Sequence, residues 1–408
     1  MQEDAPPQVI LQVLPAMGTG GVERGTIEMV QAIARAGWIP LVASSGGRFV
    51  PDLLDAGGDH ITLPLDQKEP LHILRNAFRL AQVIRERNVS LVHARSRAPA
   101  WSALLAARMC HIPFVTTYHG AYGDGRYWGK RLYNSIMARG DRVIAISAFI
   151  QKMIERRHKT DRARIRLIHR GVDISRFDPA LVDPENCEDL AETWQIRRGA
   201  PVVMLPGRVT GWKGQSLLIE ALKLMRHKEA IGVMVGGGAE NVINTLLAQA
   251  TSSGIASRIW ITGDCDDMPA ALTLADVVVS ASTRPEAFGR VVVEAQAMGK
   301  IIIASNHGGA IETVQHGKTG FLVQPRDPMA LARALDHVLD MKQDERAAMQ
   351  TAGRAAVAEN FTTRAMQDAT LAVYRELLQK TAKAPSAKAA SAQRKSGKAK
   401  SAAPKSWR

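Results

Sequence analysis

The chain has 408 residues, of which 46% are apolar and 5% aromatic, and its formal net charge is +14. This length suits two domains of ordinary size, and the composition excludes a fibrous, repetitive or wholly disordered chain. Nine Lys and Arg residues lie in residues 380–408, which contain no acid, so the other 379 residues carry only +5.

The first half of the chain alternates short strands with amphipathic helices. We predict strands at 9–15, 39–45, 90–96, 114–119 and 142–147, each short and rich in Val or Ile, with the first helix at 22–36 ending at Gly37. This rhythm is typical of a doubly wound parallel sheet. It pauses at residues 174–199, which combine prolines with mixed charge.

The same rhythm resumes in the second half. Predicted strands lie at 201–207, 231–237, 258–263, 277–282 and 301–305, and a helix is expected at 361–379. Residues 291–293 are three valines, which favour a strand, but EAQAMG follows them and ends in a glycine, so we predict a helix there. We therefore expect an N-terminal Rossmann-like domain (1–178, completed by 361–379), a linker (179–199) and a C-terminal domain (200–360).

The tail, residues 380–408, consists largely of Lys, Ala, Ser and Pro and is predicted to be disordered. It suits an anionic membrane or nucleic acid, and it equally suits a solvated tail without a partner. The chain has no aromatic interleaving or recognition module, so we expect no nucleic acid. The three separated cysteines indicate a reducing compartment. With no signal pattern and no membrane-spanning run, we expect a cytoplasmic protein whose membrane contact is peripheral.

The most specific pattern is TRPEAFGRVVVEAQAMG, in which seven residues separate Glu286 from Glu294. A helix beginning here would offer its first amides and its positive dipole end to a diphosphate. One carboxylate could bind a ribose diol and the other a sugar hydroxyl. A bare pair of glutamates would more often lie on the surface of an ordinary helix, but the surrounding residues favour a nucleotide site.

Four weaker motifs accompany this pair. GTGGVER (18–24) and GGGAE (236–240) allow close backbone approach to a ligand, although tight turns explain both. GRVTGWKG (207–214) places Arg208 and Lys213 after a strand, where they could straddle a diphosphate or simply be solvated. His119 follows a strand and could contact a sugar, although a lone His is more often structural.

No metal site is expected. Asp264 and Asp266 form a DxD pattern, but acids at the start of a short helix also cap it, and no cluster has metal-ligand spacing. No GxSxG nucleophile elbow is present.

Together these motifs resemble the retaining glycosyltransferases of family four, and the resemblance covers nearly the whole chain before the tail. It rests mainly on EAFGRVVVEAQAMG, with support from GTGGVER, TYHG, GVDISRF, GRVTGWKG, GGGAE and GGAIETVQHGKTGFLV. It implies a GT-B fold of two facing Rossmann-like αβα domains with an interdomain cleft, completed by a C-terminal crossover helix.

The resemblance also implies roles. Glu294 would bind ribose, Glu286 the donor sugar, and Arg208 and Lys213 the diphosphate. His119 would contact the transferred sugar. The remaining donor contacts would come from Gly20, Gly21, Ala287, Phe288, Gly289, Arg290 and Val291. No cofactor or metal is implied. One departure is Arg170, where the family usually has Asn before GVD.

The expected reaction moves a sugar from a nucleotide-diphosphate sugar to a glycan or glycolipid. Basic segments at 93–97, 129–131 and 155–166 suit an anionic acceptor or membrane, and solvated helix faces explain them equally well. We favour lipopolysaccharide-core or surface-glycan assembly at the inner face of the inner membrane. A nucleotide-sugar 2-epimerase and a non-catalytic nucleotide-sugar-binding protein are the alternatives.

Overall fold

The computed structural model describes residues 7–18, 20–123 and 128–383. Contacts divide the chain into two compact units. One comprises Met1–Thr116, Gly140–Arg142 and Thr370–Arg408, and the other comprises Thr117–Arg139 and Val143–Ala369. No helix among the described residues has the length and apolar character needed to cross a bilayer.

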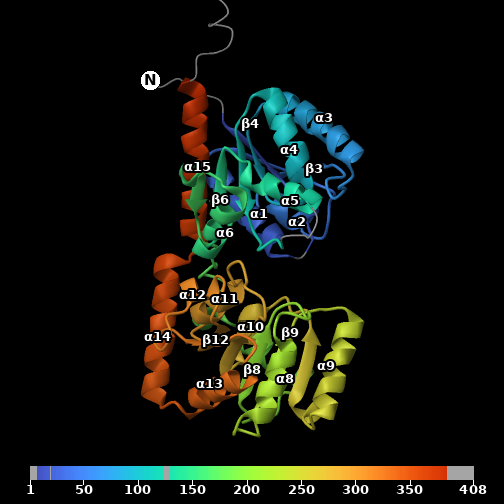
Figure 1. The fold of residues 1–408 in the computed structure, drawn as a ribbon. Helices are drawn as coiled ribbons and strands as arrows, with labels where there is room; N and C mark the ends of the chain where they lie inside the picture. The colour runs from blue at the N-terminus through green and yellow to red at the C-terminus, as the bar shows by residue number, and fades with distance from the viewer. Residues whose placement is uncertain (1–6, 19, 124–127, 384–408) are drawn as a thin grey trace, which may run out of the picture. The chain divides into compact units, whose positions relative to one another are not determined.

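The first sheet has seven strands in the order β3-β2-β1-β4-β5-β6-β7. They are β1 (Val9–Val13), β2 (Ile39–Ser44), β3 (Asp59–Thr62), β4 (Val89–Ala94), β5 (Phe114–Tyr118), β6 (Arg142–Ala145) and β7 (Ile165–Leu167). Three of them, β3, β4 and β6, are labelled in Figure 1. The helices between and after them are α1 (Gly21–Arg35), α2 (Val50–Asp55), α3 (Pro70–Glu86), α4 (Arg97–Cys110), α5 (Trp128–Ser135) and α6 (Ala148–His158). The five predicted strands are confirmed, whereas the sequence analysis did not identify β3 and β7.

The second sheet has six strands in the order β10-β9-β8-β11-β12-β13. They are β8 (Val202–Pro206), β9 (Ile231–Val235), β10 (Ile259–Gly263), β11 (Val277–Ser280), β12 (Ile302–Ser305) and β13 (Phe321–Val323). The helices are α7 (Pro184–Thr193), α8 (Gln215–Leu224), α9 (Glu240–Ser252), α10 (Met268–Thr273), α11 (Arg290–Ala297), α12 (Ala310–Thr313), α13 (Pro328–Asp340) and α14 (Gln343–Asn360). The paired strands run parallel, as predicted.

Burial explains why these segments form a doubly wound sheet. Every residue of β1, β8 and β9 is buried, because helices cover both faces of a parallel sheet and exclude alternating polar residues. The same effect makes α11 a helix despite its three valines. Val292 and Val293 are fully buried, and this packing outweighs the strand preference of β-branched residues.

The predicted helix 361–379 is α15 (Thr363–Lys383), which extends four residues into the predicted tail. Within the first unit, the Tyr374 hydroxyl lies 2.6 Å from Nδ1 of the buried His93, and Glu376 pairs with Arg142. The rest of the tail, from residue 384, lies outside the described residues. The predicted domain boundaries remain a prediction, and the proposed linker contains α7.

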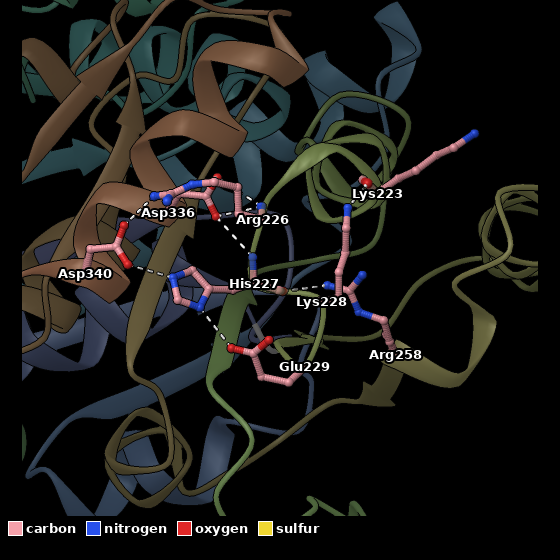
Figure 2. Close-up of polar contacts among 8 residues, drawn as sticks. All are labelled: Lys223, Arg226, His227, Lys228, Glu229, Arg258, Asp336 and Asp340. Atoms are coloured by element: carbon pink, nitrogen blue, oxygen red, sulfur yellow. Dashed lines mark hydrogen bonds and ion pairs between the residues drawn. The ribbon is translucent and has the colours of Figure 1, made fainter.

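A polar cluster fixes the turn between α8 and β9 (Figure 2). The buried carboxylate of Asp336, on α13, accepts hydrogen bonds from the backbone amides of Arg226 and His227. The imidazole of His227 lies 2.9 Å from both Glu229 and Asp340. These contacts tie the turn to α13 at the edge of the sheet where its strands begin.

Candidate donor-binding and catalytic site

The strand order of the second sheet defines where a ligand can enter. β8 and β11 are adjacent, yet the chain leaves β8 toward β9 on one side and leaves β11 toward β12 on the other. After the carboxyl ends of these two strands the chain therefore continues toward opposite sides of the sheet. In open α/β sheets this switch point is the usual position of a ligand crevice. Arg208 and Lys213 follow β8, and Glu286 follows β11.

Backbone contacts bring these two loops together. The Thr283 amide donates to the Trp212 carbonyl across 2.7 Å. Gly214 has φ +96°, and a Cβ there would lie 2.2 Å from the carbonyl oxygen of Ala281. The approach requires glycine, because an L side chain would clash and would also disfavour this φ. The result is that Lys213 is held beside the segment that carries Glu286.

Both carboxylate oxygens of Glu286 have partners. Nζ of Lys213 lies 2.8 Å from Oε2, and the Ser282 hydroxyl donates to Oε1. The Glu286 and Lys213 side chains are 15% and 21% exposed, so the pair is largely shielded from water. Nζ of Lys213 also lies 4.9 Å from the Trp212 ring centroid, within cation–π range. The carboxylate is thus oriented before any ligand binds.

A third loop, after β12, supports Glu286 from behind. The Gly309 amide donates to the Glu286 carbonyl across 2.9 Å. Gly308 has φ +64°, and a Cβ there would lie 2.5 Å from that carbonyl oxygen. This close packing fixes the backbone of Glu286. Gly308 and Gly309 begin the segment GGAIETVQHGKTGFLV, which supports the family resemblance, but the sequence predicted no role for them.

His307 joins the same network. Its Nε2 lies 2.9 Å from the Ser282 carbonyl oxygen. A carbonyl oxygen can only accept, so Nε2 carries the hydrogen and donates it. Burial lowers the pKa of His307 and so favours the neutral ring. Nδ1 is then an acceptor; it is buried and has no hydrogen-bond partner among the described residues. Sequence reasoning missed this residue, because an isolated His carries no motif signal.

Helix α11 supplies the backbone amides. Gly289, with φ +84°, precedes its first residue, Arg290, and the first amides of a helix have no partner within it. Glu294 is the fifth residue of α11. Its Oε1 lies 3.2 Å from Nε of Arg290, because helical side chains lean toward the N-terminal end.

Arg208 differs from Lys213. Its side chain is exposed and forms no ion pair with any residue that the structure describes. Its loop is fixed by Gln215, whose amide nitrogen donates to the Arg208 carbonyl across 3.1 Å, and by Gly236, where a Cβ would lie 2.5 Å from the Gly207 carbonyl oxygen. An exposed guanidinium on a fixed backbone suits an incoming anion.

Three predicted residues, Gly20, Gly21 and His119, follow strands of the first sheet. Gly20 precedes α1 and Gly21 begins it, while Thr19 between Gly18 and Gly20 lies outside the described residues. A Cβ at Gly20 would lie 2.5 Å from the Glu23 carboxylate. His119 follows β5, and its Nδ1 lies 3.5 Å from Nη1 of the buried Arg170, the residue that departs from the family pattern.

The structure corrects one expectation about charge. The basic segment 93–97 was considered as a surface for an anionic acceptor, but His93 is fully buried and Arg95 is 3% exposed. Both belong to the interior beside β4, where Nη1 of Arg95 donates to Gln12 across 3.1 Å. Burial lowers the pKa of both side chains, and these two residues offer no cationic surface.

The DxD acids have local partners. Asp264 accepts a hydrogen bond from the Gly237 amide across 2.8 Å, and Asp267 caps α10 by accepting from the Ala270 amide. The described residues include no group of three or more His, Cys, Asp or Glu that could hold a metal ion. The helix cap is therefore Asp267, one residue after the DxD pattern.

Family models match both halves of the chain. "Glycosyltransferase Family 4" matches residues 19–176, and "Glycosyl transferases group 1" matches residues 187–356. A GDP-mannose-dependent alpha-(1-6)-phosphatidylinositol monomannoside mannosyltransferase of Mycobacterium tuberculosis is 31% identical over 290 residues, which are 68% of this chain and 73% of that protein. The chain belongs to the group 1, family 4 glycosyltransferases and is a glycosyltransferase.

Solved structures agree with this assignment. A glycosyltransferase from Rickettsia africae is 38% identical with a TM-score of 0.84, covering 92% of this chain and 99% of that one. Anabaena Alr3699/HepE in complex with UDP-glucose has a TM-score of 0.80 at 24% identity, covering 90% of this chain and all of that one, and supports the fold alone. The expected α/β fold with two Rossmann-like sheets of the GT-B class is confirmed.

Proposed function

We propose that the protein is a retaining, metal-independent transferase that moves a sugar from a nucleotide-diphosphate sugar to a glycan or glycolipid of a bacterial surface polysaccharide. The observation that carries the proposal is the Glu286–Lys213 pair at the switch point beside the first amides of α11. It combines a fixed carboxylate, which can bind sugar hydroxyls, with cationic groups for a diphosphate.

Breaking the bond between the anomeric carbon and the phosphate oxygen leaves positive charge on the sugar and negative charge on the diphosphate. Arg208, Lys213 and the α11 amides stabilise the negative charge as it develops. Glu286 orients the sugar, and Glu294 binds the ribose. The acceptor hydroxyl bonds to the anomeric carbon on the face from which the diphosphate leaves. Its proton passes to the leaving phosphate oxygen, and the anomeric configuration is retained.

Relatives suggest which donors and acceptors to test. One relative is named as GDP-mannose-dependent and acts on a phosphatidylinositol monomannoside, and a structural neighbour was solved with UDP-glucose. We infer an acceptor of glycolipid type, with lipopolysaccharide core as the first candidate. The enzyme would then work at the cytoplasmic face of the inner membrane, in peripheral contact with anionic lipid.

The test is nucleotide release from GDP-mannose, UDP-glucose and ADP-sugars in EDTA, with and without a lipopolysaccharide-core extract or a phosphatidylinositol glycolipid. Release from one donor that rises with one acceptor supports the transferase. Conversion of the donor into its 2-epimer without an acceptor would favour an epimerase. Donor binding without turnover for every acceptor would favour a non-catalytic binding protein.

A further inference from the structure

Helix α3 carries a row of large apolar side chains on its outer side. Leu71, Leu74 and Phe78 are 57%, 49% and 58% exposed. Their spacing of three and four residues places them on one face of the helix. Single exposed apolar residues are ordinary on a protein surface, but three of this size in one row are not.

Helix α4 adds two further apolar side chains, Leu105 and Met109, which are 40% and 39% exposed and one turn apart. The two helices pack directly against each other, as Figure 1 also shows. The Ser102 hydroxyl on α4 donates to the Ile73 carbonyl on α3 across 2.9 Å. Leu105 and Met109 follow Ser102 by three and seven residues, so they border the side of α4 that touches α3.

The row on α3 borders the same contact. Sγ of Cys110, on α4, lies 3.6 Å from the carbonyl oxygen of Ala81, on α3. Ala81 is buried, so it marks the side of α3 that packs on α4. Leu74 and Phe78 precede Ala81 by seven and three residues and therefore lie on the same side of α3. The two rows thus lie along the α3–α4 contact. We call these five side chains the α3–α4 patch: Leu71, Leu74, Phe78, Leu105 and Met109.

Cations surround the α3–α4 patch. On α3, Arg75, Arg79 and Arg85 are exposed, and the helix contains no acid before its last residue, Glu86. On α4, which contains no acid, Arg108 is exposed and pairs with Asp141. The patch therefore combines exposed apolar area with excess positive charge.

A shallow pocket of about 390 Å3 lies at the C-terminal end of α4. Its apolar walls come from Ile112, Pro113 and Leu377, and its charged groups are Arg108, Lys380 and Asp141, which pairs with Arg108. With two basic side chains and one acid, the pocket continues the mixed apolar and basic surface beyond Met109.

We propose that the α3–α4 patch docks on an anionic phospholipid membrane. An apolar row edged by arginines inserts at the level of the lipid headgroups, where the cations meet anionic phosphates. A second copy of this chain fits less well, because a twofold contact through this face would bring arginines against arginines. This proposal rests on the proposed function, because it identifies the surface that would contact the bilayer holding a glycolipid acceptor.

The test is co-sedimentation of the full-length chain with vesicles of phosphatidylcholine alone and with 3:1 phosphatidylcholine and phosphatidylglycerol. We expect the wild type to bind the anionic vesicles and L71S/L74S/F78S to bind them at least about fivefold more weakly, given the transfer free energy of three large side chains. The triple variant keeps the basic tail, so this difference reports the patch. Leu181→Ser, at a 70% exposed position in the other unit, is the matched control and should bind normally.

Two further measurements separate the possible failures. Donor hydrolysis in the absence of vesicles should be equal in the wild type and the triple variant, and equal melting temperatures show that the variant folds. Equal vesicle binding by both proteins, or no binding by the wild type, would overturn the docking surface while leaving the transferase intact. A dimer that the triple variant dissociates, without vesicle binding, would also overturn it. If the wild type turned over no nucleotide-sugar donor, that result would count against the proposed function instead.

Discussion

Nζ of Lys213 lies 2.8 Å from Oε2 of Glu286, so the cation proposed to hold the diphosphate is paired with the carboxylate proposed to orient the sugar. A diphosphate entering the site competes for this ammonium group and frees one carboxylate oxygen for a sugar hydroxyl. Donor binding would then exchange one ion pair for another, and little charge would be left unpaired at any stage.

This relationship predicts how Glu286→Ala behaves. The carboxylate acts on the sugar as its bond breaks, so we expect kcat to fall by about 100-fold, with a much smaller change in the dissociation constant of the donor. Steady-state nucleotide release gives kcat, and calorimetric titration of the donor gives the dissociation constant. An unchanged kcat would remove Glu286 from the mechanism.

Ser282→Ala tests whether the orientation of Glu286 matters. The Ser282 hydroxyl donates to Oε1, and a hydrogen bond to a charged group contributes about 1.5–3 kcal/mol. We expect kcat/KM to fall about tenfold, mainly through kcat, with partial recovery in Ser282→Thr, which keeps the hydroxyl.

Ser305 provides the matched control for Ser282. It is also 2% exposed, but its Oγ has no hydrogen-bond partner among the described residues. Ser305→Ala removes an equally buried hydroxyl without removing a bond to Glu286, so its kcat/KM should stay within about twofold of the wild type. If both variants lost activity equally, burial rather than orientation would explain the effect.

Gly308→Ala should displace Glu286 from behind. A Cβ at this position would lie 2.5 Å from the Glu286 carbonyl oxygen and 2.7 Å from its amide nitrogen, so the loop must move. We expect a lower melting temperature together with a loss of activity at least as large as that of Ser282→Ala. Thermal unfolding and nucleotide release measure the two effects.

Gly317→Ala separates the clash from the backbone strain. Gly317 has φ +75°, similar to that of Gly308, but nothing lies within 4 Å of a Cβ placed there. Both variants bear the cost of a left-handed residue, about 1–2 kcal/mol, and only Gly308→Ala bears the clash. Equal activities in the two variants would contradict a supporting role for the loop after β12.

Much of the fold was predictable because buried parallel strands are nearly continuous apolar runs. The three strands that were not identified lack that signal. Strand β3 (Asp59–Thr62) is only partly buried. Strands β7 (Ile165–Leu167) and β13 (Phe321–Val323) are only three residues long. Such short or half-exposed strands depend on their neighbours in the sheet, and a local sequence pattern cannot reveal those neighbours.

The site was predictable only in part, for a related reason. The motif around Glu286 and Glu294 is contiguous, but the residues that hold it come from three different loops. Nothing in the sequence pairs Lys213 with Glu286 across 73 positions, or places His307 against Ser282. The basic segment 93–97 gives another example. His93 and Arg95 lie in the interior beside β4, and the charge of a sequence segment does not reveal whether it is buried.

The last prediction concerns pH and stability, at the cluster in Figure 2. Hydrogen bonds that the imidazole donates to the Glu229 and Asp340 carboxylates raise the pKa of His227 above its usual value of 6.5. The pKa of Glu229, normally 4.5, is lowered first by a hydrogen bond from its own backbone amide and then by the contact with His227. The pKa of Asp340, normally 3.8, is lowered by its hydrogen bonds with His227 and Arg226. A raised histidine pKa contributes stability that is complete below pH 6.5 and is lost as pH rises through the folded-state value. The lowered carboxyl pKa values contribute above about pH 4.5 and are lost in acid.

We therefore expect the cluster to stabilise the protein most between about pH 4.5 and 6.5. His227→Gln should lower the melting temperature by more at pH 6 than at pH 8.5, and the difference should shrink in high salt because the ion pairs are partly exposed. Asp340→Asn provides the partner variant. In the double variant the two effects should not add at pH 6, and they should come closer to additivity at pH 8.5 as the imidazole loses its proton. The cluster lies at the edge of the sheet opposite the site, so kcat should be unchanged in all three variants. A melting-temperature difference that is constant across this pH range would show that His227 contributes through packing alone.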